Sequence, residues 1–320
     1  MTEFGFSLMC ELHHPKDLVE QAKRAEAAGF DFVTISDHFH PWLYSHGHSP
    51  YAWSVLGALA ATTEEIDLVS LVTCPIIRYH PAIVAQKAAT IAAMSDGRFQ
   101  LGLGAGENLN EHVVGQGWPP AATRHAMLAE AIEIMQELWQ GEYVTHHGDF
   151  YDVEDARLYT LPDAPPPVYL AVSGDASIGL AADTDAAGMI AVDADPELVG
   201  KWDERVGSGR PKMGQLGVSV HDDAGEALRL AHERFRFSAP GWKVMSELPN
   251  PINFEAATAF VRPEDMADAI PCGPDPEPHV KAAKEWVEAG FTHVAFAQVP
   301  EDQEPFFKLW ERELRPALAG

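Results

Sequence analysis

Three ionisable side chains and an indole lie within the seven residues Ser36-Asp37-His38-Phe39-His40-Pro41-Trp42. This segment directly follows the apolar run 30–35, which predicts a buried strand. An imidazole of near-neutral pKa can take a proton from a hydroxyl, an indole can lie against a conjugated ring, and a carboxylate can orient either group. The segment predicts a reaction site at a strand end; the alternative is a loop of hydrogen-bonded polar residues around a packed Trp42.

Three glycines alternate in a second segment, Gly102-Leu103-Gly104-Ala105-Gly106-Glu107, again after an apolar run. Without side chains, they would let a flat ligand approach the backbone closely, with Glu107 at the mouth of the strand. Glu107 stands where the dinucleotide fingerprint G-x-G-x-x-G requires its third glycine. The segment therefore gives no support to a nicotinamide site of the Rossmann type.

A third segment, Ser173-Gly174-Asp175-Ala176-Ser177, joins an apolar run to a helical pattern. Small residues at the start of a helix leave backbone N–H groups free to bind an anion. A tight turn explains the same residues equally well, so this signal is weak when taken alone.

Eight strand-like runs punctuate the chain, with helical patterns of 3.6-residue period between them. The runs are Phe4–Met9, Phe30–Ile35, Leu68–Cys74, Phe99–Leu103, Val168–Val172, Met189–Val192, Leu216–Val220 and Val294–Val299. The alternation predicts a parallel α/β sheet, and eight units favour a closed (β/α)8 TIM barrel over an open doubly wound sheet. In a barrel the three segments above would meet at the carboxyl ends of the strands.

Residues 1–320 are expected to form a single barrel domain with two insertions. One covers residues 108–123 and the other the proline-rich region 237–278, where loops or short helices replace the alternation. Residues 27–33 and 288–294 resemble each other, because in each a helix ends at a glycine and a strand begins at once.

The composition of the chain limits the classes of partner that it is expected to bind. A net charge of −26 disfavours binding to nucleic acids and anionic membranes, which leaves small molecules. The chain has no apolar run of about 18 residues and no basic, apolar leader, so it is predicted to be cytoplasmic. Its three cysteines lack metal-ligand spacing and are predicted to be reduced thiols.

Four motifs together resemble the bacterial luciferase-like superfamily and, within it, the coenzyme F420-dependent glucose-6-phosphate dehydrogenase family. They are Ser-Asp-His-Phe-His-Pro-Trp at 36–42, Arg-Tyr-His-Pro-Ala-Ile at 78–83, Gly-Ala-Gly-Glu-Asn-Leu-Asn-Glu at 104–111 and Tyr-Leu-Ala-Val-Ser-Gly at 169–174. The resemblance spans essentially the whole chain. It implies a barrel that holds coenzyme F420, an 8-hydroxy-5-deazaflavin, at the carboxyl ends of its strands.

The resemblance also assigns site residues. By position, the coenzyme contacts would be Asp37, Leu71, Val72, Cys74, Ala105, Gly106, Asn110, Ser173, Gly174 and Ala176. Cys74 stands where a relative has threonine, and the family's non-proline cis peptide would be Leu71–Val72. The family moves a hydride between an alcohol or hemiacetal carbon and the deazaflavin ring. His38 would take the hydroxyl proton, Trp42 would cover the ring, and Glu107 would manage the proton at a ring nitrogen, with acid and base set by reaction direction.

One departure concerns the substrate. The sugar-phosphate enzymes grip the phosphate with two lysines and an arginine, and the matching positions here hold Asp195, Ala256 and Asp268. Two acidic side chains would repel a phosphate dianion. Another route to a phosphate site would need Lys201, Arg205, Arg210 or Lys243. The substrate is therefore predicted to be an alcohol, aldehyde or ketone other than glucose 6-phosphate.

Several alternatives remain at this point. An FMN-dependent luciferase-like monooxygenase would use the same barrel, and a barrel without catalysis would keep only binding. A metal-dependent hydrolase would use the pair His38-Phe39-His40, but the later strands end without the further imidazoles that such a site needs, so no metal is predicted. The superfamily pairs through helices near the N-terminal half, which implies a homodimer; Trp53, Leu56 and Leu59 could serve there, or could simply pack against the barrel.

Overall fold

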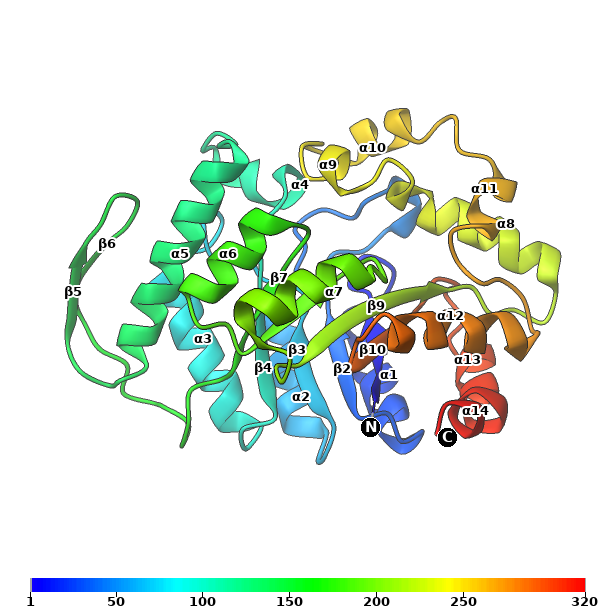
Figure 1. Ribbon diagram of the computed structural model, residues 1–320, viewed down its shortest axis with the longest axis horizontal. Coiled ribbons are helices and arrows are strands. Elements are labelled where there is room, and N and C mark those ends of the chain that lie inside the picture. Colours follow the sequence, from blue (N-terminus) through cyan, green and yellow to red (C-terminus); the bar gives the residue numbers. More distant parts are fainter. Residues whose placement is uncertain (1, 320) are drawn as a thin grey trace.

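The computed structural model describes residues 2–319, and at its centre eight parallel strands close into a barrel (Figure 1). The order around the barrel is β1-β10-β9-β8-β7-β4-β3-β2. These strands are β1 (Glu3–Leu8), β2 (Phe32–Ile35), β3 (Asp67–Ser70), β4 (Phe99–Leu103), β7 (Val168–Ala171), β8 (Gly188–Ala191), β9 (Lys212–Val218) and β10 (His293–Gln298). The predicted (β/α)8 TIM barrel is confirmed, and the open sheet is excluded by the pairing of β1 with both β2 and β10.

Helices surround the barrel in the order that the sequence periodicity predicts. The longer ones are α1 (Pro15–Ala27), α2 (Ala52–Thr62), α3 (Pro81–Met94), α5 (Ala121–Leu138), α6 (Asp175–Asp183), α7 (Pro196–Trp202), α8 (Ala224–Phe235), α12 (Pro276–Glu288) and α13 (Glu304–Leu309), followed by the short α14 (Arg315–Leu318). Within residues 2–319, none of the helices combines the length and the apolar character that crossing a membrane would take.

The two similar helix–glycine–strand segments adopt the predicted geometry. Gly29 follows α1 with φ of +75°, and Gly290 follows α12 with φ of +100°. Both values lie in the left-handed region, where a side chain would be strained. Each glycine therefore ends its helix and turns the chain directly into the next barrel strand.

The interior of the barrel is filled by side chains from six of its strands. This inner group contains Phe32, Val69, Tyr169, Ile190, Met213 and Ala295, all buried. A much larger apolar cluster lies between the strands and the surrounding helices, and it includes Trp53, Leu56 and Leu59 of α2. These three side chains are at most 5% exposed, so they pack against the barrel and are not available on a dimer-forming surface.

Three local features differ from the sequence-based prediction. A hairpin of β5 (Val144–His147) and β6 (Asp152–Ala156), which was not predicted, projects from the body at the left of Figure 1. Its strands bury apolar residues on one side only, so few apolar residues mark these strands in the sequence. The carboxylate of Glu130 on α5 fixes its turn by accepting three backbone N–H groups, from residues 149–151. In addition, β9 begins four residues before its predicted start, and α12 begins inside the expected second insertion.

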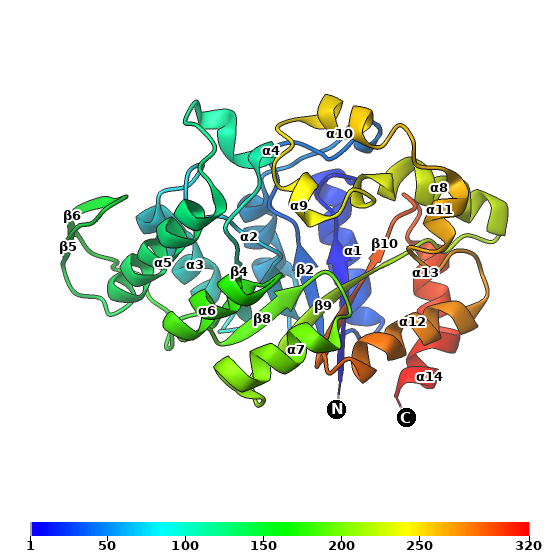
Figure 2. The same cartoon turned by 45° about the horizontal axis from the view of Figure 1, so that its top comes forward.

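Both predicted insertions lie at the carboxyl ends of the strands. The first contains the short α4 (Asn108–Glu111), and the second contains α9 (Trp242–Met245), α10 (Pro251–Ala257) and α11 (Pro263–Ala267). Figures 1 and 2 both show α4 beside α9 above the barrel, with α10 next to them. The long connection between β9 and α12 therefore forms part of the roof over the mouth.

Two of the alternating glycines, Gly102 in β4 and Gly104 just after it, allow close packing within the barrel. A Cβ on Gly102 would lie 2.0 Å from the carbonyl oxygen of Ser70, and one on Gly104 would lie 2.8 Å from a methyl group of Val72. The space beside these two glycines is therefore filled by the protein itself, and the approach of a flat ligand to this segment stays a prediction.

We expect Gly102→Ala to lower the free energy of unfolding by about 3 kcal/mol, because the backbone of β3 cannot yield to the added methyl group. The matched control is Gly57→Ala in α2, where the nearest atom would lie 3.9 Å away, and a gain of about 0.5 kcal/mol is expected. Urea unfolding of both variants measures the difference. Equal stabilities would contradict the packing role of Gly102.

Candidate active site

His38 lies between two buried glutamates at the mouth of the barrel. Its Nδ1 is 3.1 Å from Oε1 of Glu11, and its Nε2 is 3.1 Å from Oε1 of Glu107. The imidazole is 10% exposed, Glu11 1% and Glu107 7%. Because β1, β2 and β4 all end on this side, three loops that are far apart in the sequence bring the three groups into one row.

Asn110 connects the loop after β2 to the loop after β4. Its Oδ1 accepts hydrogen bonds from the backbone N–H groups of Phe39 and His40 at 2.8 and 3.1 Å. Its Nδ2 donates to Oε1 of Glu107 at 2.5 Å. One buried amide therefore sets both the backbone next to His38 and the orientation of the Glu107 carboxyl group.

Trp42 completes the row. Its ring lies edge-on to His38, with centroids 4.7 Å apart, and stacks in parallel on Phe237 at 4.9 Å. Phe254 contacts it from the edge at 5.1 Å. Both phenylalanines belong to the second insertion, so the indole is held by a segment that follows it by about two hundred residues in the sequence.

Asp37 is buried and fully hydrogen-bonded. Its carboxylate accepts from Trp53 Nε1 at 3.0 Å, Thr73 Oγ1 at 2.8 Å, Tyr79 Oη at 3.1 Å and Arg78 Nη2 at 3.1 Å. Arg78 also donates to the Asp37 carbonyl oxygen at 2.8 Å. The aspartate thus ties the start of the reactive segment to α2 and to the chain that follows β3.

Two glutamates near the mouth have raised pKa values. Burial raises the pKa of Glu107, and the nearby His38 opposes this only in part. Burial also raises the pKa of Glu111 to about 7, although Arg78 acts in the opposite direction. Arg78 lies 3.1 Å from Asp37 and 3.5 Å from Glu111, so a single cation serves two acids.

The predicted residues that follow β3 and those that follow β4 lie side by side. The peptide bond Leu71–Val72 is cis, as the resemblance implied. Cys74 is buried, and a Cβ on Gly106 would lie 2.4 Å from its sulfur. Burial raises the pKa of the Cys74 thiol well above its ordinary value, so this side chain acts as a small packed group and not as a thiolate. Ala105 is partly buried next to them.

The third predicted segment lies at the start of α6, beside β4. Ser173 and Ala176 are exposed and Gly174 is partly exposed, with nothing within 4 Å of a Cβ built on Gly174. Ser177 Oγ accepts from the N–H of Ser173 at 3.0 Å and donates to the carbonyl of Gly174 at 2.9 Å. The segment is an ordered turn that borders open space.

Sequence reasoning missed four residues that hold this site together. Glu11 was not singled out, although it follows the predicted first strand 4–9 by two positions, which is where a barrel presents functional groups. Thr73, Arg78 and Tyr79 hold Asp37. Of these, only Arg78 and Tyr79 lay in a motif, and nothing in that motif indicated an acidic partner.

A metal is not indicated by the arrangement. Among residues 2–319, no three histidine, cysteine, aspartate or glutamate side chains are grouped so that they could hold an ion. The Nδ1 of His40 lies 3.0 Å from the carbonyl oxygen of Leu109.

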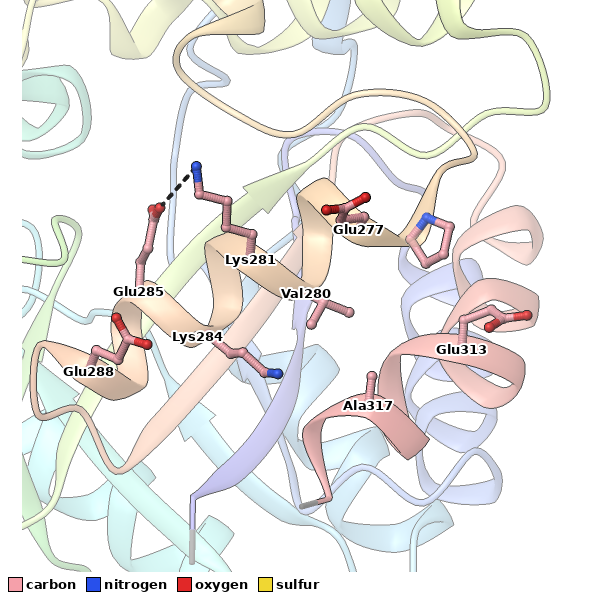
Figure 3. A pocket seen from close by; sticks show the side chains of 9 residues that line it. Glu277, Val280, Lys281, Lys284, Glu285, Glu288, Glu313 and Ala317 are labelled. Carbon is pink, nitrogen blue, oxygen red and sulfur yellow. Dashed lines mark ion pairs between the residues drawn. The ribbon is translucent and has the colours of Figure 1, made fainter.

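A surface groove of about 550 Å³ lies elsewhere, on the outside of the barrel between α12 and α14 (Figure 3). Lysines and glutamates line it, including the pair Lys281–Glu285 at 3.9 Å. None of the predicted site residues lines this groove, so it is separate from the row around His38.

Comparison with known proteins identifies the family. The family model described as luciferase-like monooxygenase matches residues 2–293. The chain belongs to the luciferase-like family. The family assignment made from the four motifs is therefore confirmed, and with it the class of enzyme, an oxidoreductase of the luciferase-like class.

Members of this family that are similar over their full lengths include the F420-dependent glucose-6-phosphate dehydrogenases of Microbacterium testaceum and Mycobacterium avium. The first is 36% identical and covers 98% of this chain and 97% of its own, and the second is 34% identical and covers 99% and 98%. Among solved structures, an F420-dependent secondary alcohol dehydrogenase in complex with an F420-acetone adduct is 30% identical. Its TM-score is 0.90, and 99% of both chains is covered. The tetrahydromethanopterin reductase of Methanopyrus kandleri, at 22% identity and a TM-score of 0.76, shares the fold.

The raised pKa of Glu111 predicts a pH-dependent stability. Because its folded pKa of about 7 exceeds the unfolded value, the group stabilises the fold at low pH, and this contribution is lost as the pH rises from about 4.5 through 7. Between pH 5 and 8, wild type should lose on the order of 3 kcal/mol of unfolding free energy relative to Glu111→Gln. Urea unfolding at both pH values measures this, with Glu264→Gln as an exposed control. A difference independent of pH would contradict it.

Proposed function

We propose that this protein is a coenzyme F420-dependent oxidoreductase that transfers a hydride between an alcohol or hemiacetal carbon and the deazaflavin ring. The observation that carries the proposal is the row of Glu11, His38 and Glu107, which places an imidazole between two buried carboxyl groups at a barrel mouth. The similarity over full length to F420-dependent dehydrogenases supports it.

The residues present fit the coenzyme. Oε2 of Glu107 is buried and has no hydrogen-bond partner in the protein, so it is free to contact a ring nitrogen. The space beside Gly174 is open. We propose that the backbone around Leu71–Val72, Ala105 and Gly106, with Cys74, forms the floor under the ring, and that Ser173, Gly174 and Ala176 border the more distant part of the coenzyme. The coenzyme supplies the hydride acceptor or donor.

Glu11 and Glu107 give the two nitrogens of His38 different roles. The anion of Glu11 favours a proton on Nδ1, which leaves Nε2 as the basic position. In the oxidative direction, Nε2 accepts the proton of the substrate hydroxyl, and the resulting positive charge lies between two carboxyl groups. Burial raises the pKa of Glu107, and this carboxyl group holds or releases a proton through its free oxygen. Trp42 covers the reacting groups and excludes water.

Asp37 and Asn110 support this arrangement indirectly. All the carboxylate contacts of Asp37 come from side chains of the protein, so we propose that it shapes the coenzyme site by anchoring the loop. Asn110 positions Glu107 in the same way, through its own hydrogen bond.

We further propose that the substrate is an uncharged or cationic alcohol, or the matching aldehyde or ketone, and not glucose 6-phosphate. Asp195 and Asp268 are exposed acids at positions where the phosphate would need cations. Two of the four alternative cations are already engaged, because Lys201 pairs with Asp175 and Glu197, and Arg210 pairs with Asp185. The similarity to a secondary alcohol dehydrogenase agrees with a small uncharged substrate.

Anaerobic mixing with oxidised F420 should bleach the deazaflavin absorbance in the presence of simple secondary alcohols. With glucose 6-phosphate the rate should be at least about tenfold lower, since the dianion meets acidic side chains. Stopped-flow absorbance with matched substrate concentrations makes the comparison. Equal rates would refute the substrate proposal, and failure to bind F420 together with co-purifying FMN would favour a flavin monooxygenase instead.

Glu11→Gln should lower kcat by about 100-fold while leaving F420 affinity unchanged, because it removes the charge that stabilises protonated His38 without changing the shape of the side chain. Coenzyme fluorescence gives the affinity and steady-state kinetics gives kcat. The control is Glu3→Gln, at the opposite end of β1. A wild-type kcat in Glu11→Gln would remove Glu11 from the mechanism.

Cytoplasmic location, pairing into a homodimer and a single domain over residues 1–320 stay predictions. The structure removes Trp53, Leu56 and Leu59 from the candidates for a pairing surface, because all three are buried in the outer core.

A further inference from the structure

A polar contact joins the two insertions directly next to Glu107. Asn108 is the first residue of α4, and its N–H is one of the groups that a helix leaves without an internal partner. It donates to the carbonyl oxygen of Ser246 at 2.9 Å, and the Asn108 side chain donates to the carbonyl of Glu247 at 3.0 Å. The segment after α9 therefore caps the helix that begins beside Glu107.

The side chain of Glu247 anchors the same contact. One of its oxygens accepts from Trp118 Nε1 at 3.0 Å, and the other lies 3.2 Å from Nη2 of Arg124. Arg124 also stacks on the Trp118 ring, with its guanidinium carbon 4.1 Å from the centroid. Arg124 is 5% exposed, whereas 53% of the Glu247 side chain is exposed. A well-packed cation thus holds an accessible acid of the other insertion.

The segment held in this way also supports Trp42. Met245 of α9 lies one residue before Ser246 and packs in one buried apolar cluster with Trp42, Phe237 and Phe254. Figures 1 and 2 both show α9 beside α4. The contact at Glu247 is therefore connected to two neighbours of His38. It reaches Glu107 through Asn108, and it reaches Trp42 through Met245.

We propose that Glu247 is a positioning residue that latches the second insertion to the loop after β4 and thereby fixes Glu107 and Trp42 around His38. The latch consists of Glu247, Arg124, Trp118 and Asn108. It acts through the backbone of Asn108 and the packing of Met245, without touching coenzyme or substrate. The kinetic consequence of this inference rests on the proposed function. The latch itself can be tested by a measurement that does not require enzyme activity.

The first test is hydrogen exchange. In Glu247→Ala the backbone N–H of Asn108 should exchange on the order of tenfold faster, because its acceptor on Ser246 is no longer held in place. The matched control is Glu264→Ala, an exposed acid of the same insertion for which the described residues give no ion pair or hydrogen bond to the side chain. Exchange at Asn108 that is the same in both variants would overturn the latch.

The second test is kinetic. With F420 and a secondary alcohol, Glu247→Ala should raise KM and lower kcat so that kcat/KM falls roughly tenfold, while coenzyme affinity and the unfolding midpoint stay close to those of Glu264→Ala. Glu247→Gln keeps an acceptor for Trp118 and should recover part of the loss. A merely stabilising contact would shift the unfolding midpoint and leave both kinetic constants unchanged, which would overturn the proposal.

A more conservative variant separates loss of the latch from misfolding of the protein. Trp118→Phe keeps the ring under Arg124 but removes the donor to Glu247, and kcat/KM should fall about threefold in the same direction. If wild type itself fails to reduce F420 with any alcohol, the proposed function fails, and the exchange measurement still decides on the latch. If wild type is active and both Trp118→Phe and Glu247→Ala match the control, the latch has no positioning role.

Discussion

The contact of one imidazole with two buried carboxyl groups imposes the main constraint on this structure. Glu11, His38 and Glu107 are at most one-tenth exposed, yet all three can carry charge. Buried ionisable groups are costly unless their partners are placed accurately. The loops that follow β1, β2 and β4 must therefore keep fixed positions relative to one another, and much of the mouth serves that purpose.

The charge balance of the mouth explains why two of its acids have raised pKa values. Asp37 and Glu111 share the single guanidinium of Arg78, and Asp37 receives three further donors. Arg78 lies farther from Glu111 than from Asp37, and burial raises the pKa of Glu111 to about 7. Glu107 likewise has its pKa raised by burial, and one of its oxygens has no partner in the protein. An acid of raised pKa next to an imidazole gives the mouth two groups that can exchange protons near neutral pH.

The second insertion contributes to the site through residues that the sequence did not single out. It supplies Phe237 and Phe254 around Trp42, and Glu247 for the latch on the loop after β4. The barrel thus brings the strand ends together, and the roof above it sets the orientation of the side chains that those ends carry. Divergence of substrate within one family is most easily achieved in such a roof, because it can change without altering the strands.

The sequence by itself determined the architecture and the centre of the site. Regular alternation of apolar runs and 3.6-residue patterns reflects local periodicity, so eight strands and a barrel were predictable. His38, Trp42 and Glu107 were visible because reactive side chains directly follow such runs. The hairpin 144–156 was missed because its strands bury only one side, and the true boundaries of β9 and α12 were set by pairing partners.

Only the tertiary structure decided what surrounds those residues. Contacts between residues far apart in the chain place Glu11 against His38 and give the Asp37 carboxylate its four donors. They also pack Gly102 against the carbonyl of Ser70. The same holds for the packing of Phe237 on Trp42. Residue type and spacing report what a side chain can do, whereas burial and partners, which fix its charge and direction, exist only once the strands have closed.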